Sequence, residues 1–162
     1  MEANKTLLTR NIEDKVVLIT GSGGSIGSEI SRQVVKNNPK KIILLDSNEY
    51  ALFSIKNEIE DIAKNSSVHA VLANITDSAR VTDVCRTFGV DTIYHAAAYK
   101  HVPLVEINSI NSIDNNVFSL IDSKPLNFTL IACGVVLDDH PLSVIVVNDL
   151  FHPSIKMHLY YI

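Results

Sequence analysis

Three glycines follow a short apolar run near the start of the chain, at a spacing that suits the binding of phosphate groups. Gly21, Gly24 and Gly27 come directly after Val16–Thr20, and an amphipathic segment follows them. In this order the first glycine allows a sharp turn, the second a close approach to a pyrophosphate, and the third close packing of a helix on the strand. The helix N-terminus then directs its free N–H groups at the phosphates. The pattern therefore predicts a dinucleotide-binding turn, with a positive φ at Gly24.

An aspartate ends the next apolar run at the distance that such a turn requires. Asp46 lies nineteen residues after Gly27, at the end of the segment KKIILLD. A carboxylate at this place hydrogen-bonds the adenosine ribose, although an isolated aspartate at a strand end can equally be a turn residue. Its charge disfavours a 2′-phosphate, whereas Arg32 on the first helix could reach one. The cofactor prediction is therefore NAD or NADP.

Apolar periodicity predicts alternating strands and helices around these residues. Strands are expected at about 15–20, 41–45, 68–73 and 91–95, and helices at about Ser25–Val35 and 78–87. A further helix is expected between the second and third strands, with Leu52, Ile55, Ile59 and Ile62 at helical spacing and its end near 65–67. This alternation indicates an α/β fold, a Rossmann-type doubly wound parallel sheet, incomplete and with an atypical C-terminal tail. The expected organisation is a lead-in over 1–14, an NAD(P)-binding domain over 15–118 and a divergent tail over 119–162. Apolar runs at 126–137 and 142–151 could add one or two strands to the sheet.

The composition excludes several functional classes. The chain has 162 residues, 46% of them hydrophobic, and a net charge of −4 without any run of Lys or Arg, which argues against nucleic-acid binding. Cys85 and Cys133 have no metal-ligand spacing, so we expect no metal site and buried thiols in a reducing compartment. There is no apolar signal region and no stretch long enough to span a membrane. The expectation is a soluble, cytoplasmic protein.

Three segments resemble the nucleotide-sugar 4,6-dehydratases of bacterial polysaccharide biosynthesis, which are extended short-chain dehydrogenase/reductases. These segments are TGSGGSIGSEI, LLDSNEYALF and YHAAAYKHVPLVE, and the resemblance covers about residues 12–118. It implies a UDP-sugar substrate, UDP-N-acetylglucosamine in particular. It leaves homo-oligomerisation open.

The resemblance also implies roles for individual residues. In the family the glycine turn cradles the pyrophosphate, the next backbone N–H groups donate to it, the loop after strand three flanks the adenine, and small residues after strand four pass beneath the cofactor. The implied cofactor-binding residues are Gly21, Gly24, Ser25, Ile26, Gly27, Asp46, Asn74, Ile75, Ala96, Ala97, Ala98 and Asn116, and those on the substrate side are Lys100, His101 and Glu106. The family more often has Asp where this chain has Asn74. Taken singly, the alanines could be filler, His95 and His101 structural, Lys100 a surface charge and Glu106 a helix cap.

The resemblance ends after Phe118. The family continues with a Ser-Thr-Asp-Lys segment and a Tyr or Met four residues before a catalytic Lys, and neither is present after Phe118. These residues would move protons and orient the ribose, so we assign no catalytic residue and expect the chain to be an inactive, truncated or frame-disrupted member. Asp138-Asp139-His140 is the compact set of titratable residues in the tail, and it is more typical of a turn. The alternatives are a non-catalytic NAD(P)-binding module or another extended short-chain reductase or epimerase.

Overall fold

The first half of the protein alternates strands and helices. The computed structural model describes residues 11–97, 129–135, 143–148 and 156–161. Its elements are β1 (Val16–Thr20), α2 (Ser25–Val35), β2 (Lys41–Asp46), α3 (Glu49–Ile62), β3 (Ser67–Leu72), α4 (Ser78–Phe88), β4 (Thr92–His95), β5 (Thr129–Val135), β6 (Ser143–Asn148) and β7 (Lys156–Tyr161). The predicted alternation up to β4 is confirmed.

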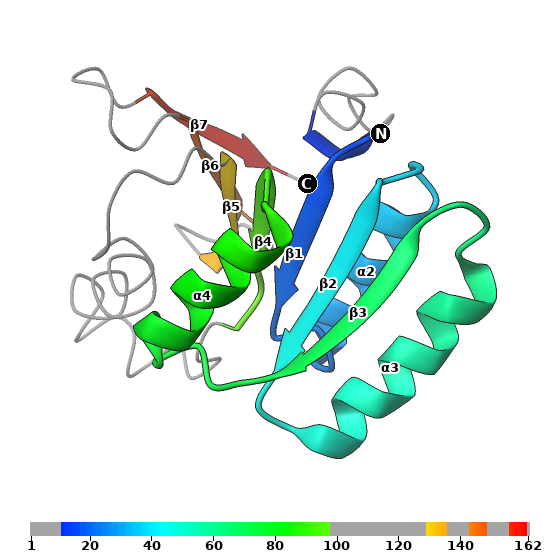
Figure 1. Ribbon diagram of the computed structural model, residues 1–162. Coiled ribbons are helices and arrows are strands. Elements are labelled where there is room, and N and C mark those ends of the chain that lie inside the picture. Colours follow the sequence, from blue (N-terminus) through cyan, green and yellow to red (C-terminus); the bar gives the residue numbers. More distant parts are fainter. Residues whose placement is uncertain (1–10, 98–128, 136–142, 149–155, 162) are drawn as a thin grey trace.

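All strands belong to one sheet, in the order β3-β2-β1-β4-β5-β6-β7 (Figure 1). The strands β1 to β5 pair in parallel, whereas β6 and β7 pair antiparallel. The two apolar runs of the tail contain β5 and β6, while β7 lies in a segment for which the sequence analysis made no prediction. Because β2 and β4 flank β1, the direction of winding reverses there, and ligands of doubly wound sheets bind outside the carboxyl ends of the strands at such a point.

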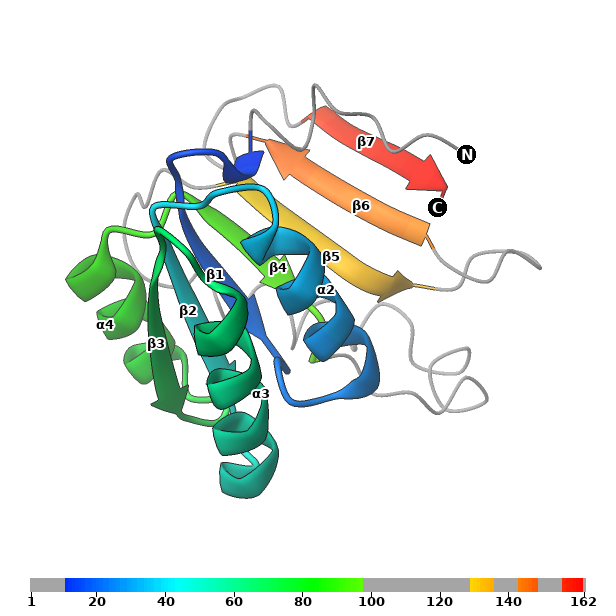
Figure 2. The same cartoon turned by 90° about the vertical axis from the view of Figure 1, so that its right-hand side faces the viewer.

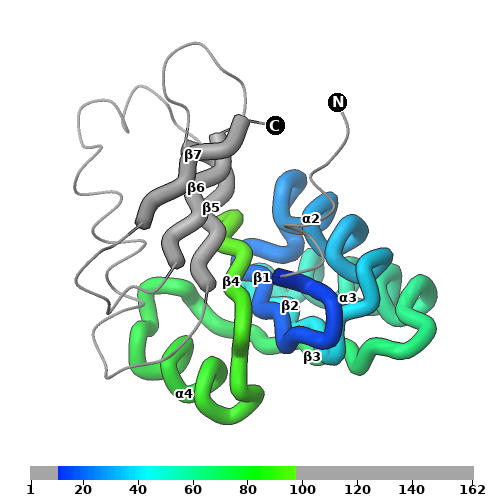
Figure 3. Tube along the Cα trace, turned by 90° about the horizontal axis from the view of Figure 1, so that it is seen from above, coloured from blue at the N-terminus to red at the C-terminus, as the bar shows by residue number. Residues whose placement is uncertain are grey.

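Helices cover both faces of the parallel strands. α2 and α3 lie on one face and α4 on the other (Figures 2 and 3). Val34, Leu52 and Ile59 pack with Val17 and Ile19 of β1 in one apolar cluster. A second cluster lies on the other face of the sheet. In it, Val81 and Val84 of α4 pack with Leu18 of β1 and Ile43 of β2. The central strands are therefore apolar on both sides, which explains the uninterrupted apolar runs VVLIT and IILL.

The inner face of α2 includes small residues as well as apolar ones. Apolar spacing predicts Ile26, Ile30 and Val34 on one face of this helix. In the structure Gly27, Ser31, Val34 and Val35 are buried, and Ile26 and Ile30 are half-buried. Ile30 and Val34 pack in the same apolar cluster. Ser31 satisfies its buried hydroxyl by donating to the carbonyl oxygen of Gly27 at 2.8 Å.

Ile12 lies in the lead-in expected over 1–14, yet its side chain is part of the core. It is 1% exposed and belongs to the apolar cluster beneath α2 and α3.

Cys85 of α4 is buried, and burial raises the pKa of its thiol to about 11, as expected of a structural cysteine. Within the described part of the chain, no helix has the length and apolar character that a membrane span requires.

Candidate dinucleotide-binding site

The turn after β1 meets the chain that leaves β4. Gly21 has a φ of +65°, a conformation that favours glycine. A Cβ atom on Gly21 would lie 2.8 Å from the Cα of Ala97 and 2.9 Å from the carbonyl carbon of Ala96. The N–H of Ala96 donates to the carbonyl oxygen of Thr20 at 3.1 Å. The predicted site residues Gly21, Ala96 and Ala97 are thus brought together at the point where the winding reverses.

Gly24 and Gly27 differ in their surroundings. A Cβ on Gly27 would overlap the carbonyl oxygen of Gly21, so this position seats α2 against the turn. Among the described residues, a Cβ on Gly24 would meet the Gly21 oxygen at 3.3 Å, a tight contact but a longer one than at Gly27. The positive φ expected at Gly24 is wrong: its φ is −72° and its ψ 167°, which is extended backbone. The positive φ belongs to Gly21, where the chain reverses.

The N-terminus of α2 adjoins Gly24, which is exposed. Gly24 is the N-cap of this helix and supplies no side-chain cap. The first turn of a helix directs backbone N–H groups toward its N-terminus, and Ser25 and Ile26 belong to this turn. Such a positive helix end beside an exposed glycine suits a phosphate group.

Asp46 connects the turn to the next loop. Its side chain is half-buried at the end of β2. Oδ2 accepts the N–H of Gly23 at 2.8 Å, and Oδ1 accepts the N–H of Asn48 at 2.9 Å. The carboxylate therefore lies against the glycine turn, as the ribose prediction requires, and carboxylate oxygens can accept further hydrogen bonds from hydroxyl groups.

Sequence reasoning missed the part that Gly23 plays. A Cβ there would lie 2.6 Å from the Cβ of Ala51 and 3.2 Å from Oδ2 of Asp46. Gly23 is thus confined between α3 and the carboxylate. The available signal was the glycine pair Gly23-Gly24, where the expected pattern requires only the second glycine.

The loop after β3 lies beside the loop after β2. The N–H of Ala73 donates to the carbonyl oxygen of Asp46 at 3.0 Å. Asn74 is exposed, and its Oδ1 accepts the N–H of Thr76 at 3.0 Å. Ile75 is half-buried and packs against the α4 side of the core. Asn74 and Ile75 thus follow a strand end next to that of Asp46, where the prediction places the adenine.

Thr20 and His95 form a buried polar pair between β1 and β4. They are register partners, and Thr20 Oγ1 lies 2.7 Å from Nδ1 of His95. Burial lowers the pKa of His95 to about 4, so the ring is neutral near pH 7. Nε2 has no hydrogen-bond partner among the residues that the structure describes.

Arg32 is engaged away from the turn. Its Nε and Nη2 donate to both carboxylate oxygens of Glu58 on α3, at 2.6 and 3.0 Å. Nη1 donates to Glu29 at 3.2 Å. The hydrogen bonds from Arg32 lower the pKa of Glu58, and they raise the pKa of Arg32 itself. The pKa of Glu29 is lowered first by a hydrogen bond from Gln33 and then by the one from Arg32. The guanidinium therefore joins α2 to α3, which argues against its use on a 2′-phosphate.

Five predicted residues lie outside the described residues. They are Ala98, Lys100, His101, Glu106 and Asn116. Their assignment to the cofactor or to the substrate side stays a prediction.

The topology defines the class of fold. A parallel sheet with alternating helices and a glycine turn at the reversal point is a Rossmann-type α/β fold. A short-chain dehydrogenase/reductase from Mycobacterium ulcerans superposes with a TM-score of 0.57 over 68% of this chain and 45% of its own, at 14% identity. NAD+-bound xylitol dehydrogenase gives a TM-score of 0.54 over 68% of this chain and 46% of its own, at 23% identity.

The chain belongs to the polysaccharide biosynthesis protein family, whose pattern matches residues 17–124. The capsular polysaccharide biosynthesis protein CapD of Staphylococcus aureus is 42% identical over 118 residues, which are 72% of this chain and 20% of CapD. A UDP-N-acetylglucosamine 4,6-dehydratase (inverting) of Campylobacter jejuni is 33% identical over 64% of this chain and 29% of the enzyme. The chain therefore spans between about a fifth and a third of the length of these relatives.

Proposed function

We propose that this chain binds NAD(P) as the dinucleotide-binding part, residues 15–118, of a nucleotide-sugar 4,6-dehydratase acting on UDP-N-acetylglucosamine. The observation that carries the proposal is the contact between the glycine turn and the Asp46 carboxylate at the carboxyl end of the sheet. The relationship to a UDP-N-acetylglucosamine 4,6-dehydratase supports the substrate class.

Different residues of the site would contact different parts of the dinucleotide. The N–H groups at the start of α2 would hold the pyrophosphate above Gly24, and Asp46 would accept hydrogen bonds from the adenosine ribose. The neighbouring loop would flank the adenine through Asn74 and Ile75. When bound, the nicotinamide supplies reversible hydride transfer. The backbone at Ala96 and Ala97 would leave room beneath the cofactor.

NAD is the proposed cofactor in preference to NADP. The Asp46 carboxylate would repel a 2′-phosphate, and Arg32 is paired with Glu58. Calorimetric titration of the purified chain with NAD and with NADP tests this preference for NAD. We expect tighter binding of NAD. Tighter binding of NADP would overturn the choice of cofactor, and no binding of either would overturn the proposed function.

A second candidate function is a binding module without catalysis. The sequence after Phe118 has no YxxxK or MxxxK pattern, and this observation favours binding without turnover for the chain as it stands. A third is another extended reductase or epimerase, since a UDP-glucose 4-epimerase of Rickettsia bellii is 32% identical over 64% of the chain. Measurement of turnover with UDP-N-acetylglucosamine and with UDP-glucose separates the three.

A further inference from the structure

Asp46 is a junction of three loops at the carboxyl end of the sheet. Its side chain accepts the N–H of Gly23 from the turn after β1 and the N–H of Asn48 from its own loop. Its main-chain oxygen accepts the N–H of Ala73 from the loop after β3. Two of these contacts use the same carboxylate that the proposed ribose contact requires.

The glycine turn depends on such external support for its shape. Gly21, Gly23 and Gly24 have no side chains to pack, so the turn is fixed through its backbone. Gly24 donates to the carbonyl oxygen of Gly21 at 3.1 Å, and Ser22 donates to that of Leu45 at 3.2 Å. Gly23 donates to the Asp46 carboxylate at 2.8 Å, and hydrogen bonds to a charged acceptor are the stronger kind.

We propose that Asp46 is a positioning residue for the pyrophosphate turn as well as a ligand of the ribose. This inference rests on the proposed binding of a dinucleotide. The carboxylate holds Gly23 against Ala51 and thereby sets the direction of the N–H groups that follow at the start of α2. Loss of the carboxylate therefore weakens the binding of the diphosphate even in a ligand without ribose hydroxyls.

A comparison of two nucleotides separates the two roles. We would titrate wild type and Asp46→Ala with ADP and with 2′,3′-dideoxy-ADP, which lacks the hydroxyls that Asp46 could accept from. A ribose contact alone leaves the affinity for dideoxy-ADP unchanged by the substitution. The positioning role lowers it by roughly 3- to 10-fold, which is less than the roughly 10-fold or more that a direct charge-assisted hydrogen bond contributes, because the carboxylate acts on the diphosphate through the turn. An unchanged affinity for dideoxy-ADP would overturn the inference.

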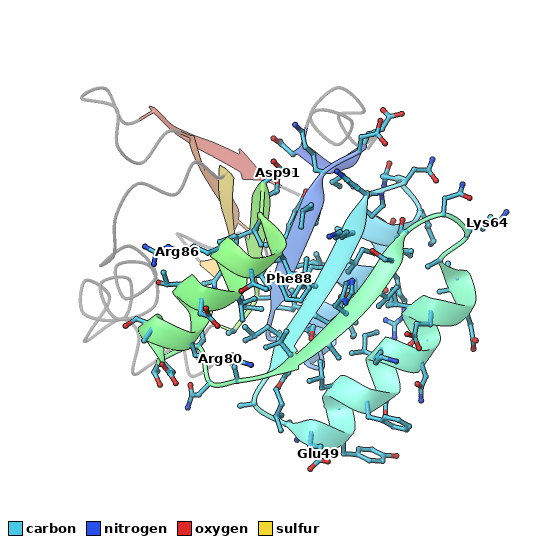
Figure 4. All side chains as sticks on the ribbon, in the orientation of Figure 1. Glu49, Lys64, Arg80, Arg86, Phe88 and Asp91 are labelled. Carbon is cyan, nitrogen blue, oxygen red and sulfur yellow. The ribbon has the colours of Figure 1, made fainter. Side chains whose placement is uncertain are left out.

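Asp91→Ala is the matched control. Asp91 Oδ2 also accepts a backbone N–H at 2.8 Å, that of Val16. Asp91 lies at the amino end of β4, at the opposite end of the sheet from the candidate site. Glu49, at the start of α3, lies near the carboxyl ends of the strands, where that site is (Figure 4). Asp91→Ala should retain the wild-type affinity for both nucleotides. An equal loss of affinity in both variants would assign the effect to general destabilisation and overturn the inference.

A measurement without ligand distinguishes failure of the inference from failure of the proposed function. Amide hydrogen exchange of Gly23, followed by NMR in the free protein, should be faster in Asp46→Ala than in wild type and unchanged in Asp91→Ala. Unchanged exchange of Gly23 in Asp46→Ala would overturn the positioning role, whatever the protein binds. Faster exchange of Gly23 in Asp46→Ala, together with a wild-type protein that binds neither ADP nor NAD, would retain the contact and overturn the proposed function along with its consequence for binding.

Discussion

Gly24 is less crowded than Gly21 and Gly27, although a Cβ there would still lie 3.3 Å from the Gly21 oxygen. A Cβ on Gly21 would meet the backbone of Ala96 and Ala97, and one on Gly27 would overlap the Gly21 oxygen. Gly24 is exposed and extended, with a φ of −72°. Substitution at these positions therefore separates folding from binding at the level of single residues.

Gly24→Val should abolish NAD binding while the protein stays folded. The valine would occupy the space proposed for the pyrophosphate, and we expect the affinity for NAD to fall by more than about 10-fold, or about 1.4 kcal/mol. The loss of stability should be about 1 kcal/mol, because valine is a poorer N-cap than glycine and its Cβ would press on the Gly21 oxygen, although the extended backbone accepts it. Calorimetric titration and urea unfolding measure the two effects.

Gly27→Ala is the contrasting variant. Its Cβ would overlap a backbone oxygen, so we expect a loss of stability of about 2 kcal/mol or more. Wild-type NAD affinity in Gly24→Val would contradict the assignment of the phosphate to this turn, and wild-type stability in Gly27→Ala would contradict the packing of α2.

His95 should make the stability depend on pH. Burial lowers its pKa in the folded protein to about 4, below the usual value of 6.5. Between these values the unfolded chain binds a proton that the folded protein does not, so stability falls as the pH falls through this window. The contribution is about 2 kcal/mol between pH 7.5 and pH 5.

The variant His95→Asn measures this contribution. Asparagine does not titrate and retains a polar group near Thr20, the partner of His95 Nδ1. Urea unfolding at pH 7.5 and pH 5 should show that wild type loses about 2 kcal/mol more than the variant on acidification. Equal losses in the two proteins would show that His95 is not buried in neutral form.

At the scale of elements, α3 shows what local patterns can predict. Leu52, Ile55 and Ile59 are buried as their spacing predicts, while Ile62, in the last turn, is 37% exposed. The N-cap Asn48 begins the helix, and its side chain accepts the N–H of Ala51 at 3.0 Å. Ala51 is also the residue against which Gly23 packs. The start of this helix thus contributes to the shape of the turn.

Asn48→Ala should lower the stability by about 1 kcal/mol through loss of the N-cap. Serine caps a helix about as well as asparagine, so Asn48→Ser should restore the stability to within a few tenths of a kcal/mol. Urea unfolding of the three proteins checks both expectations. A serine variant as unstable as the alanine variant would show that the cap hydrogen bond does not stabilise α3.

The contacts that sequence reasoning missed all depend on spatial arrangement rather than on local pattern. Ser31 lies on the buried face of α2 beside Gly27, and apolar spacing does not encode its burial, whereas the glycine pattern does predict close packing at Gly27. Thr20 and His95 meet because β4 adds beside β1 in a particular register. Gly23 contacts Asp46 because two loops end at one edge of the sheet. Strand positions were predictable from uninterrupted apolar runs, because the parallel sheet is covered on both faces. Helix positions were predictable from the helical spacing of apolar residues.

At the scale of the whole molecule, the sheet order brings the candidate site together from separate βα units. Gly21 follows β1, Asp46 ends β2, Asn74 follows β3, and Ala96 and Ala97 follow β4. Parallel strands place all these residues at the carboxyl edge of the sheet, where the winding reverses beside β1, and ligands of doubly wound sheets bind at such a point. The location of the site was therefore predictable from the order of elements, whereas the hydrogen bonds within it required the structure.

The chain as it stands should bind NAD without dehydrating UDP-N-acetylglucosamine. Dehydration requires a base for the sugar C5 proton and an acid for the departing C6 hydroxyl, and the sequence after Phe118 supplies neither the Tyr/Met-xxx-Lys nor the Ser-Thr-Asp-Lys segment of the family. Incubation of the purified chain with UDP-N-acetylglucosamine and NAD, followed by mass spectrometry, should show unchanged substrate. The same preparation should bind NAD in a calorimetric titration, which shows that the site has formed. A protein-dependent loss of one water from the substrate would contradict the prediction and would assign the acid and base to other residues of this chain.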